Sequence, residues 1–290
     1  MQYKPSTYTI LIVSFFVFAT QVNAQTNTEK ILNNASISLG VGFANYGGDL
    51  QQKRYTLKQA GLARTIGIGY NLTNRLQVRG DYTFAKIGAD DKQNASAVLQ
   101  QRNLNFKANL FETALTLQYD LIDEDRYGLV PYLYAGIAYF KASPYTYSAD
   151  GTKYFLAGLH TEGQGLPNDA SEPAYSTKHI SIPFGFGLRM KLNDVFAVSF
   201  ESGFRKTFTD YIDDVSSTYA DYTLLNNYNP VSAQLAFRGG EVKDGTSYPA
   251  AGTQRGNAAN KDYYYFGLVK LQANLSFLNK NRLACAKRVL

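Results

Sequence analysis

Long segments in which apolar residues alternate with small or polar ones constrain the fold of this chain more than any other feature. An alternation of period two predicts β-strands, because successive side chains of a strand point to opposite faces. Eight such segments follow one another along the chain, at residues 35–46, 64–72, 75–86, 111–119, 133–139, 180–190, 196–205 and 263–277. The sequence therefore predicts an all-β fold.

The two faces of these segments differ in a way that indicates a membrane barrel. In the sixth segment, Ile180, Phe184 and Leu188 share one face, while Gly185 and Arg189 share the other. A narrow lumen accepts glycine beside a charged side chain, so the apolar face is expected to meet lipid. A soluble, lipocalin-like barrel would show the same alternation with the faces exchanged. It would leave several charged residues on a face with no apolar partner: Arg79, Glu112, Glu201 and Lys270.

The connections between the segments alternate in length. Long ones span 47–61, 89–104, 144–177 and 211–261, and short ones fall at 73–74, 122–127 and 193–194. This order is typical of extracellular loops and periplasmic turns. We therefore predict an eight-stranded antiparallel up-and-down transmembrane β-barrel with long extracellular loops over residues 35–278. A periplasmic segment, 25–34, would precede it, and a short basic periplasmic tail, 279–290, would follow.

The chain is rich in aromatic residues, with 23 Tyr and 18 Phe. Outer-membrane barrels carry aromatic girdles where their strands leave the lipid. We expect such girdles from tyrosines near the strand ends: Tyr46, Tyr82, Tyr119, Tyr139 and Tyr263.

The first residues have the pattern of a Sec signal peptide. Lys4 supplies a positive charge, residues 9–19 are apolar, and small residues at 22–24 form a cleavage site before Gln25. We therefore expect export, cleavage after Ala24, and residence in the outer membrane of a Gram-negative bacterium. The single Cys285 excludes a disulfide within the chain. A closed barrel needs none, because no strand edge is left unpaired.

The net charge of +6 is modest, and the basic residues are scattered along the chain. Nucleic-acid binding is therefore not expected. No cofactor is expected either. The expected partners are outer-membrane lipid and lipopolysaccharide.

Charged residues on the inward face form the first candidate site, a lumen network: Arg79, Asp81, Glu112, Arg189, Glu201, Arg205 and Lys270. The short turn at 193–194 sets a register that puts Glu201 opposite Gly187 and diagonal to Arg189, within reach of a long side chain. The network could line a selective pore or form a salt-bridged plug. We favour the plug, because side chains just fill an eight-stranded lumen.

The second candidate site lies where the seventh segment enters the longest loop. Asp210, Asp213 and Asp214 offer three carboxylates, which Ca²⁺ would accept as ligands. Their spacing is not that of a known Ca²⁺ loop, and no glycine supplies the sharp turn. We favour a structural role, in which they tie the last loop to the barrel rim through charged hydrogen bonds to groups such as Arg255.

Catalysis is the third possibility, because some eight-stranded outer-membrane barrels modify lipid A. Such chemistry calls for a histidine base, a serine nucleophile and a carboxylate. Only His160 and His179 are present, and neither has a convincing arrangement of partners. An enzyme is not expected.

Several sequence words resemble the PorG-like family of outer-membrane barrels from Bacteroidota, which is associated with type IX secretion. They lie at residues 45–50 (NYGGDL), 103–109 (NLNFKAN), 131–136 (PYLYAG), 161–165 (TEGQG), 182–187 (IPFGFG), 203–216 (GFRKTFTDYIDDVS), 255–257 (RGN) and 261–262 (KD). The most specific words contain a set of rim residues: Lys206, Thr209, Asp210, Tyr211, Asp213, Asp214, Arg255 and Asn257.

The resemblance implies a non-enzymatic barrel that anchors or assists a type IX secretion apparatus, with periplasmic ring proteins as partners. A narrow passive channel and a lipid A-modifying enzyme are the alternatives.

Overall fold

The computed structural model describes residues 24–51, 53, 55–123, 128–166, 173–243 and 245–278. The predicted signal peptide before Ala24, the basic tail 279–290 and Cys285 lie outside these residues.

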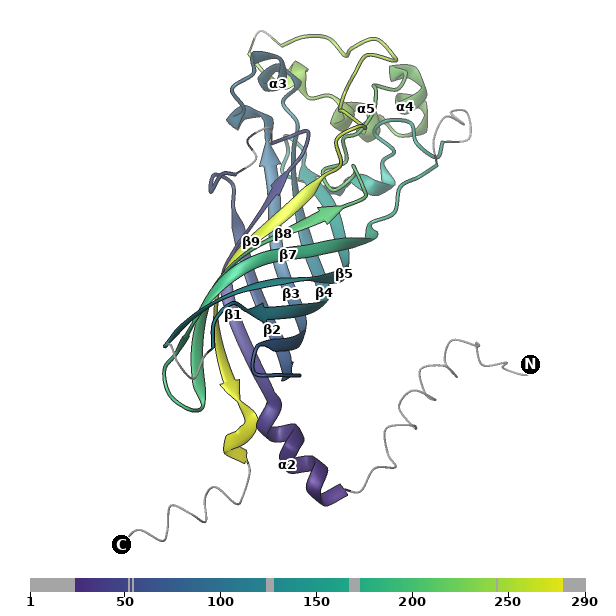
Figure 1. The fold of residues 1–290 in the computed structure, drawn as a ribbon. Coiled ribbons are helices and arrows are strands. Elements are labelled where there is room, and N and C mark those ends of the chain that lie inside the picture. The colour runs from purple at the N-terminus through teal and green to yellow at the C-terminus, as the bar shows by residue number, and fades with distance from the viewer. Residues whose placement is uncertain are drawn as a thin grey trace, which may run out of the picture.

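Within this part of the chain, eight long strands close into a barrel (Figure 1). They are β1 (Ala35–Gly47), β2 (Gly61–Asn71), β3 (Leu76–Asp90), β4 (Asn105–Asp120), β5 (Leu129–Tyr147), β7 (Lys178–Lys191), β8 (Phe196–Thr207) and β9 (Tyr263–Asn274). Each strand is antiparallel to the next, and β9 pairs with β1 to close the barrel. The predicted fold class is confirmed. We call the end with the long loops the loop end, and the opposite end the turn end.

Several strands continue above the predicted boundaries at the loop end. The third long loop was predicted to begin at residue 144, which is wrong, because β5 runs to Tyr147 and pairs there with a short strand, β6 (Lys153–Phe155). β5 extends into the residues predicted as loop because its last residues pair with both β4 and β6.

The predicted end of the last strand is also wrong. β9 stops at Asn274, whose side chain accepts a hydrogen bond from the Ser276 backbone N–H at 3.0 Å and turns the chain into the 3₁₀ helix η5 (Leu275–Leu278). Beside η5 lies helix α2 (Ala24–Asn34), which covers the whole segment predicted as 25–34. Both helices extend below the barrel at the turn end (Figure 1).

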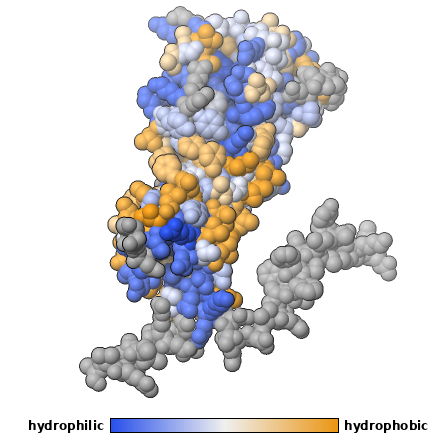
Figure 2. Space-filling model, in the orientation of Figure 1, coloured by the Kyte–Doolittle hydropathy of each residue, from blue (hydrophilic) through white to orange (hydrophobic). Residues whose placement is uncertain are grey.

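An apolar belt crosses the face of the barrel that Figure 2 shows, and large apolar side chains are exposed on all eight long strands. Its side chains are exposed although they are large; Ile66 and Phe186, for example, are 56% and 57% exposed. Such a surface suits hydrocarbon, as in membrane-spanning barrels. Among the described helices, none has the length and apolar character needed to cross a bilayer.

The predicted aromatic girdle holds only in part. Tyr82, Tyr119 and Tyr139 are about half exposed on the outer face. Tyr46 is fully buried, so its prediction as a girdle residue is wrong. The alternation of β1 changes near its end, because Tyr46 lies under the first long loop and the last one.

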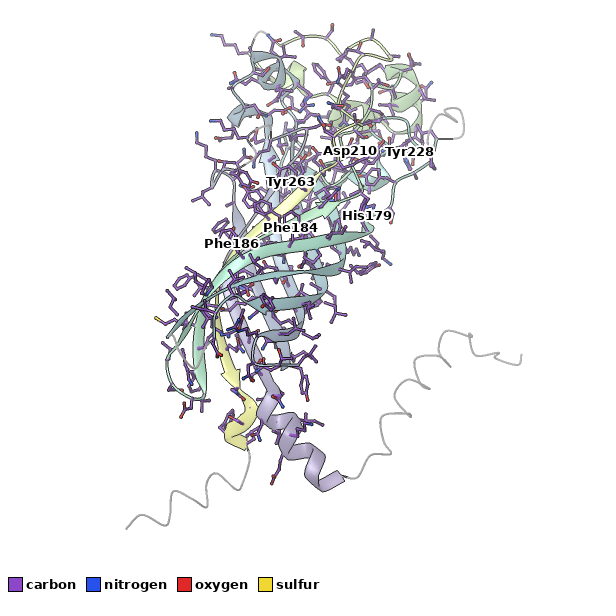
Figure 3. The ribbon with its side chains drawn as sticks, in the orientation of Figure 1. His179, Phe184, Phe186, Asp210, Tyr228 and Tyr263 are labelled. Carbon is purple, nitrogen blue, oxygen red and sulfur yellow. The ribbon has the colours of Figure 1, made fainter. Side chains whose placement is uncertain are left out.

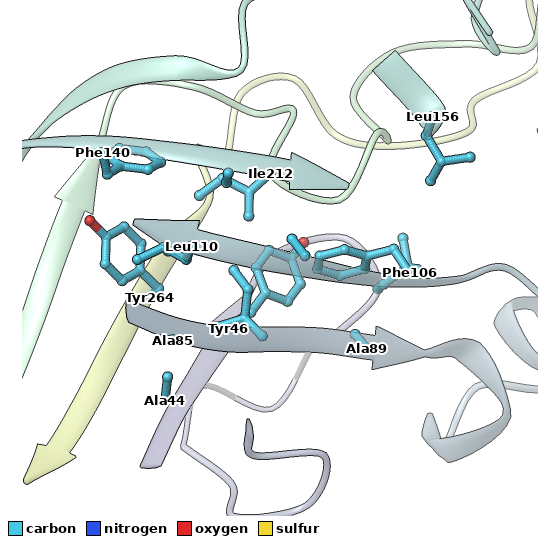
Figure 4. Close-up of a cluster of buried hydrophobic side chains, with 14 of the residues drawn as sticks. Ala44, Tyr46, Ala85, Ala89, Phe106, Leu110, Phe140, Leu156, Ile212 and Tyr264 are labelled. Carbon is cyan, nitrogen blue, oxygen red and sulfur yellow. The ribbon is translucent and has the colours of Figure 1, made fainter. Parts of the chain in front are cut away.

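The hydrophobic core lies at the loop end, inside the upper barrel (Figure 4). Phe106, Leu110 and Phe140 come from the wall, and Ile212 and Leu235 come from the last long loop, which folds down onto them. Short elements complete this cover: η2 (Asp91–Gln93), α3 (Ala97–Arg102), η3 (Leu156–Gly158), α4 (Tyr222–Tyr228), α5 (Pro230–Ala236) and η4 (Gly239–Glu241). We call this cover the cap.

Candidate functional site

The charged residues of the lumen form a closed ring in the middle of the barrel. Arg79 contacts Glu201 at 2.6 Å and Asp81 at 2.9 Å. Lys270 contacts the same two carboxylates, at 3.0 Å and 3.1 Å. Each cation therefore faces two carboxylates and each carboxylate two cations. Tyr132 adds a hydrogen bond from its hydroxyl to Glu201 at 2.7 Å.

Two further ion pairs lie above and below this ring. On the loop-end side, Arg205 contacts Glu112 at 3.0 Å, and the Tyr264 hydroxyl donates to the same carboxylate at 2.7 Å. On the turn-end side, Arg189 contacts Asp120 at 2.5 Å. Asp120 is the last residue of β4 and shares the inward face with Glu112. It was not predicted as a lumen residue, because the predicted segment ended at residue 119.

One predicted contact is wrong. The register is the expected one, with Glu201 opposite Gly187. Arg189, however, binds Asp120 from β4, while Glu201 binds Arg79 and Lys270 from β3 and β9. Glu201 is diagonal to Lys270 on the neighbouring strand β9 and also meets Arg79 from across the lumen, so its carboxylate is already paired with two other cations.

This part of the lumen is nearly solid and carries no net charge. The four cations Arg79, Arg189, Arg205 and Lys270 balance the four carboxylates Asp81, Glu112, Asp120 and Glu201. The cavity beside the ring has a volume of about 20 Å³. A single water needs roughly 10–15 Å³ on this measure, so the cavity holds one or two waters. The geometry is that of a plug.

The cap is held by Glu162, a residue of the third long loop that the sequence reasoning did not single out. Its carboxylate accepts from Arg255 Nη1 at 2.8 Å and from the backbone N–H groups of Ser216 and Ser217 at 2.9 Å and 3.0 Å. Ser217 Oγ also donates to it, at 2.7 Å. A buried carboxylate satisfied by this many donors fixes the last loop against the third. Its presence in the word TEGQG was the signal that could have found it.

Arg255 joins this network to the rim residue Asp214. Its Nη1 donates to the Asp214 backbone carbonyl at 2.6 Å, and its Nη2 lies 3.8 Å from the Asp214 carboxylate. The same carboxylate accepts from Thr161 Oγ1 and from the Tyr175 hydroxyl, both at 2.6 Å. The expected tie between the aspartate word and Arg255 is therefore present for Asp214.

Asp213 belongs to a different group. The Tyr46 hydroxyl donates to Asp213 at 2.5 Å and to Asp262 at 3.1 Å, which brings the first and last strands together over the lumen. Burial holds the pKa of both carboxyls well above the ordinary value, aided by the charge of Asp49 near Asp213 and by that of Asp213 near Asp262. One shared proton would relieve the repulsion between them.

Asp210 lies at the loop end of the barrel, as Figure 3 shows. It is 2% exposed, and neither of its carboxylate oxygens has a hydrogen-bond partner. Burial raises the pKa of Asp210 to about 7. Burial also raises the pKa of Asp214, to about 6, although Arg255 opposes that shift. The cap thus contains carboxyls that change charge near neutral pH.

The remaining rim residues are more dispersed. The Asn257 N–H donates to Asp49 at 2.8 Å, and Tyr211 stacks on Tyr175 with ring centres 4.4 Å apart. Thr209 Oγ1 accepts from the Tyr211 N–H at 3.2 Å. Lys206 points outward and does not join the cap.

The second long loop is tied in by a pair that the sequence reasoning missed. Arg102 contacts Asp91 at 2.7 Å and 2.8 Å, in a two-pronged pair. Its Nη1 also donates to the Arg255 backbone carbonyl at 2.6 Å. All four long loops therefore meet in the cap.

The arrangement offers little to a metal or to catalysis. Among the described residues, no group of three or more His, Cys, Asp or Glu side chains is arranged to hold a metal ion. His160 Nδ1 lies 2.5 Å from the Gln164 carbonyl, and His179 Nε2 lies 2.6 Å from the Ser176 carbonyl. In these contacts neither ring nitrogen faces a serine hydroxyl or a carboxylate.

An apolar belt, a charge-filled lumen and long loops gathered at one end define an integral β-barrel of the outer-membrane type. The chain belongs to the family described as "Domain of unknown function (DUF6089)", which matches residues 8–235. No curated protein matches the chain.

Solved structures similar to this chain include three outer-membrane proteins. Neisserial surface protein A has 12% identity and a TM-score of 0.42, over 83% of this chain and 96% of its own. Ail of Yersinia pestis has 11% identity and a TM-score of 0.40, over 83% and 97%. OprG of Pseudomonas aeruginosa has 10% identity and a TM-score of 0.40, over 83% and 98%.

Proposed function

We propose that this protein resides in the outer membrane of a Gram-negative bacterium and acts there as a non-enzymatic anchor or accessory of a type IX secretion apparatus. The observation that carries the proposal is the sealed interior. A lumen filled by paired charges and covered by four interlocked loops leaves little room for a solute, which favours a function at the surfaces of the barrel.

The words that resemble the PorG-like family support this proposal, because they meet in space. Glu162, Asp214 and Arg255 come from three of these words and form one buried cluster. Tyr46 and Asp262, from two others, share a hydrogen bond. The residues that carry the resemblance therefore contact one another in the cap. The resemblance is not limited to the glycine-aromatic pattern that is common to barrels.

The turn end offers the surface on which periplasmic proteins would act. A recess of about 200 Å³ opens there, lined among others by Asn71, Arg189, Lys191 and Asn193. On α2 below it, Ile31 is 52% exposed. A polar recess beside an exposed apolar side chain suits a protein partner, because interfaces combine apolar anchors with polar surroundings.

The experiment is co-purification of ring proteins from envelopes that express tagged protein, combined with a secretion assay of a deletion strain. We expect the ring proteins to co-purify and secretion to fall in the deletion strain. The variant Ile31→Asp should weaken the association, while Tyr222→Asp, an equally exposed position at the loop end, should leave it unchanged. A clean purification without ring proteins, together with normal secretion, would refute the proposal.

A further inference from the structure

Six basic side chains form a band around the outside of the barrel. They are exposed and lie on six of the eight long strands: Arg64, Lys86, Lys107, Lys141, Lys178 and Lys206. We call this band the basic girdle. Its members share the outward face of the apolar belt; Lys141, for example, is two residues from Tyr139, which is 52% exposed.

The girdle borders the belt on the loop-end side. On β7, Lys178 lies two residues beyond the exposed Ile180, and on β3, Lys86 lies two residues beyond Phe84. The register continues the band from strand to strand. Lys141 of β5 lies directly opposite Lys178 of β7, and Arg64 of β2 lies opposite Phe84.

These charges are not neutralised by the protein. Within the described part of the chain, none of the six forms an ion pair with a carboxylate. The outward face of the described strands carries one acidic residue, Asp90, and it is engaged with the Lys92 N–H at 2.9 Å. Like charges directly opposite each other on neighbouring strands destabilise a sheet. The pair Lys141–Lys178 is therefore unfavourable unless an anion lies beside it.

The girdle has no counterpart at the turn end. There the outward positions of the described strands are apolar or aromatic: Leu76, Tyr119, Leu129, Met190 and Phe196. The nearest lysine, Lys191, lines the recess at the barrel mouth instead. On the described strands, the outward-facing basic residues therefore lie on the loop-end side of the belt only.

We propose that the basic girdle binds the phosphate groups of a phosphorylated lipid in the leaflet at the loop end. This leaflet is the outer one, which rests on the membrane placement given under Proposed function. Lysine stems lie along apolar surface while their ammonium groups reach toward polar headgroups. The girdle continues directly into the belt, so one lipid molecule places its acyl chains on the belt and its phosphates on the girdle. A soluble anion would use only half of this surface.

The test measures lipid retention by native mass spectrometry of the purified full-length barrel in a non-ionic detergent. The probes are diphosphorylated lipid A and the same lipid A after removal of its phosphates. The test variant is the double substitution Lys141→Gln/Lys178→Gln. The matched control is Lys92→Gln/Lys243→Gln, which removes two exposed loop lysines outside the girdle.

We expect the native barrel to retain the phosphorylated form preferentially. Each basic residue near an anionic surface contributes about 1 kcal/mol, so the double variant should retain the phosphorylated form roughly thirtyfold less. The control variant should match the native barrel. A second pair, Arg64→Gln/Lys86→Gln on the neighbouring strands β2 and β3, should repeat the loss independently.

Three results would overturn the proposal. The first is equal retention of the two lipid forms, and the second is equal loss in the control variant. The third is full displacement of the lipid by millimolar inorganic phosphate, which would assign the girdle to soluble anions. None of these results depends on ring proteins, so the lipid assignment and the secretion role fail separately.

A charge reversal separates binding from structure. Lys141→Glu should pair with Lys178 and raise the thermal unfolding temperature in detergent without anionic lipid. The same variant should lose retention of diphosphorylated lipid A. If the unfolding temperature and the retention of diphosphorylated lipid A changed in the same direction, the girdle would be a structural feature only.

Discussion

Glu162 and Arg255, from the third and fourth long loops, form an ion pair of 2.8 Å in which both side chains are almost completely buried. Removing one partner of such a pair leaves an uncompensated charge and costs about 3–5 kcal/mol. Glu162→Ala should therefore open the cap and expose the last loop to protease in intact cells.

The pair permits a double-mutant cycle. Glu162→Met/Arg255→Met should regain a large part of the protease resistance lost in either single variant. Glu241→Gln, which affects the more exposed pair with Arg238, serves as the control and should change stability by less than about 1 kcal/mol. Additive losses in the cycle would show that the two residues act independently.

The sealed lumen predicts an absence of current. Protein inserted in planar bilayers should show no single-channel steps, because the ring of Arg79, Asp81, Glu201 and Lys270 leaves room for only one or two waters. The triple variant Arg79→Ser/Tyr132→Ser/Glu201→Ser should admit water and produce small ohmic steps. Steady conductance of the native protein would restore the channel alternative.

The stability of the cap should fall as the pH rises. A carboxyl whose folded pKa lies above its unfolded value binds protons more tightly in the folded state. For Asp210 the two values are about 7 and 3.8, so stability should decrease between about pH 4 and pH 7. The shift corresponds to about 2–4 kcal/mol for this group.

Asp210→Asn removes this dependence. It should make the cap more resistant to protease at pH 8 and change little at pH 4.5. Asp194→Asn, in an exposed turn, is the control and should leave the profile unaltered. A cap that is weaker at pH 4.5 than at pH 8 in the native protein would contradict the assignment.

The glycine at position 187 makes room for a lumen tyrosine. A Cβ atom there would lie 2.3 Å from the Tyr132 ring, which in turn holds Glu201. Gly187→Ala should lower the temperature at which the barrel unfolds in detergent, as heat-dependent gel mobility measures. Overpacking of this kind costs about 1–3 kcal/mol. Adding Tyr132→Leu should relieve the clash, whereas Gly128→Ala, with open space around it, should be neutral.

The strands and their faces could be predicted because lipid imposes a rule at every second residue. Phe184 and Phe186 lie on the outer wall (Figure 3), as their alternation with Gly185 and Gly187 predicts. Lipid no longer imposes this rule beyond the belt, and the missed boundaries, at the loop end of β5 and the turn end of β9, lie there. The extension of β5 to Tyr147 depends on β6, a partner that the sequence pattern does not mark.

The candidate site was predicted in its membership but not in its contacts. Strand register alone does not determine which carboxylate pairs with Arg189, because the long side chains of several strands meet inside the lumen. Glu162 was overlooked because a single acidic residue in a glycine-rich loop gives no signal of burial. Its role arises from five donors brought by distant segments.

The shared hydrogen bonds of Tyr46 have a consequence for how the barrel is made. Tyr46 and Asp262 are separated by 216 residues, and the cap forms only where the first and last strands have met. Contacts this distant in sequence are slow to form and come late in folding. The cap therefore forms only in a barrel whose first and last strands have paired. In a barrel that has not closed, the long loops would be open to proteases, and in a closed barrel they would be protected.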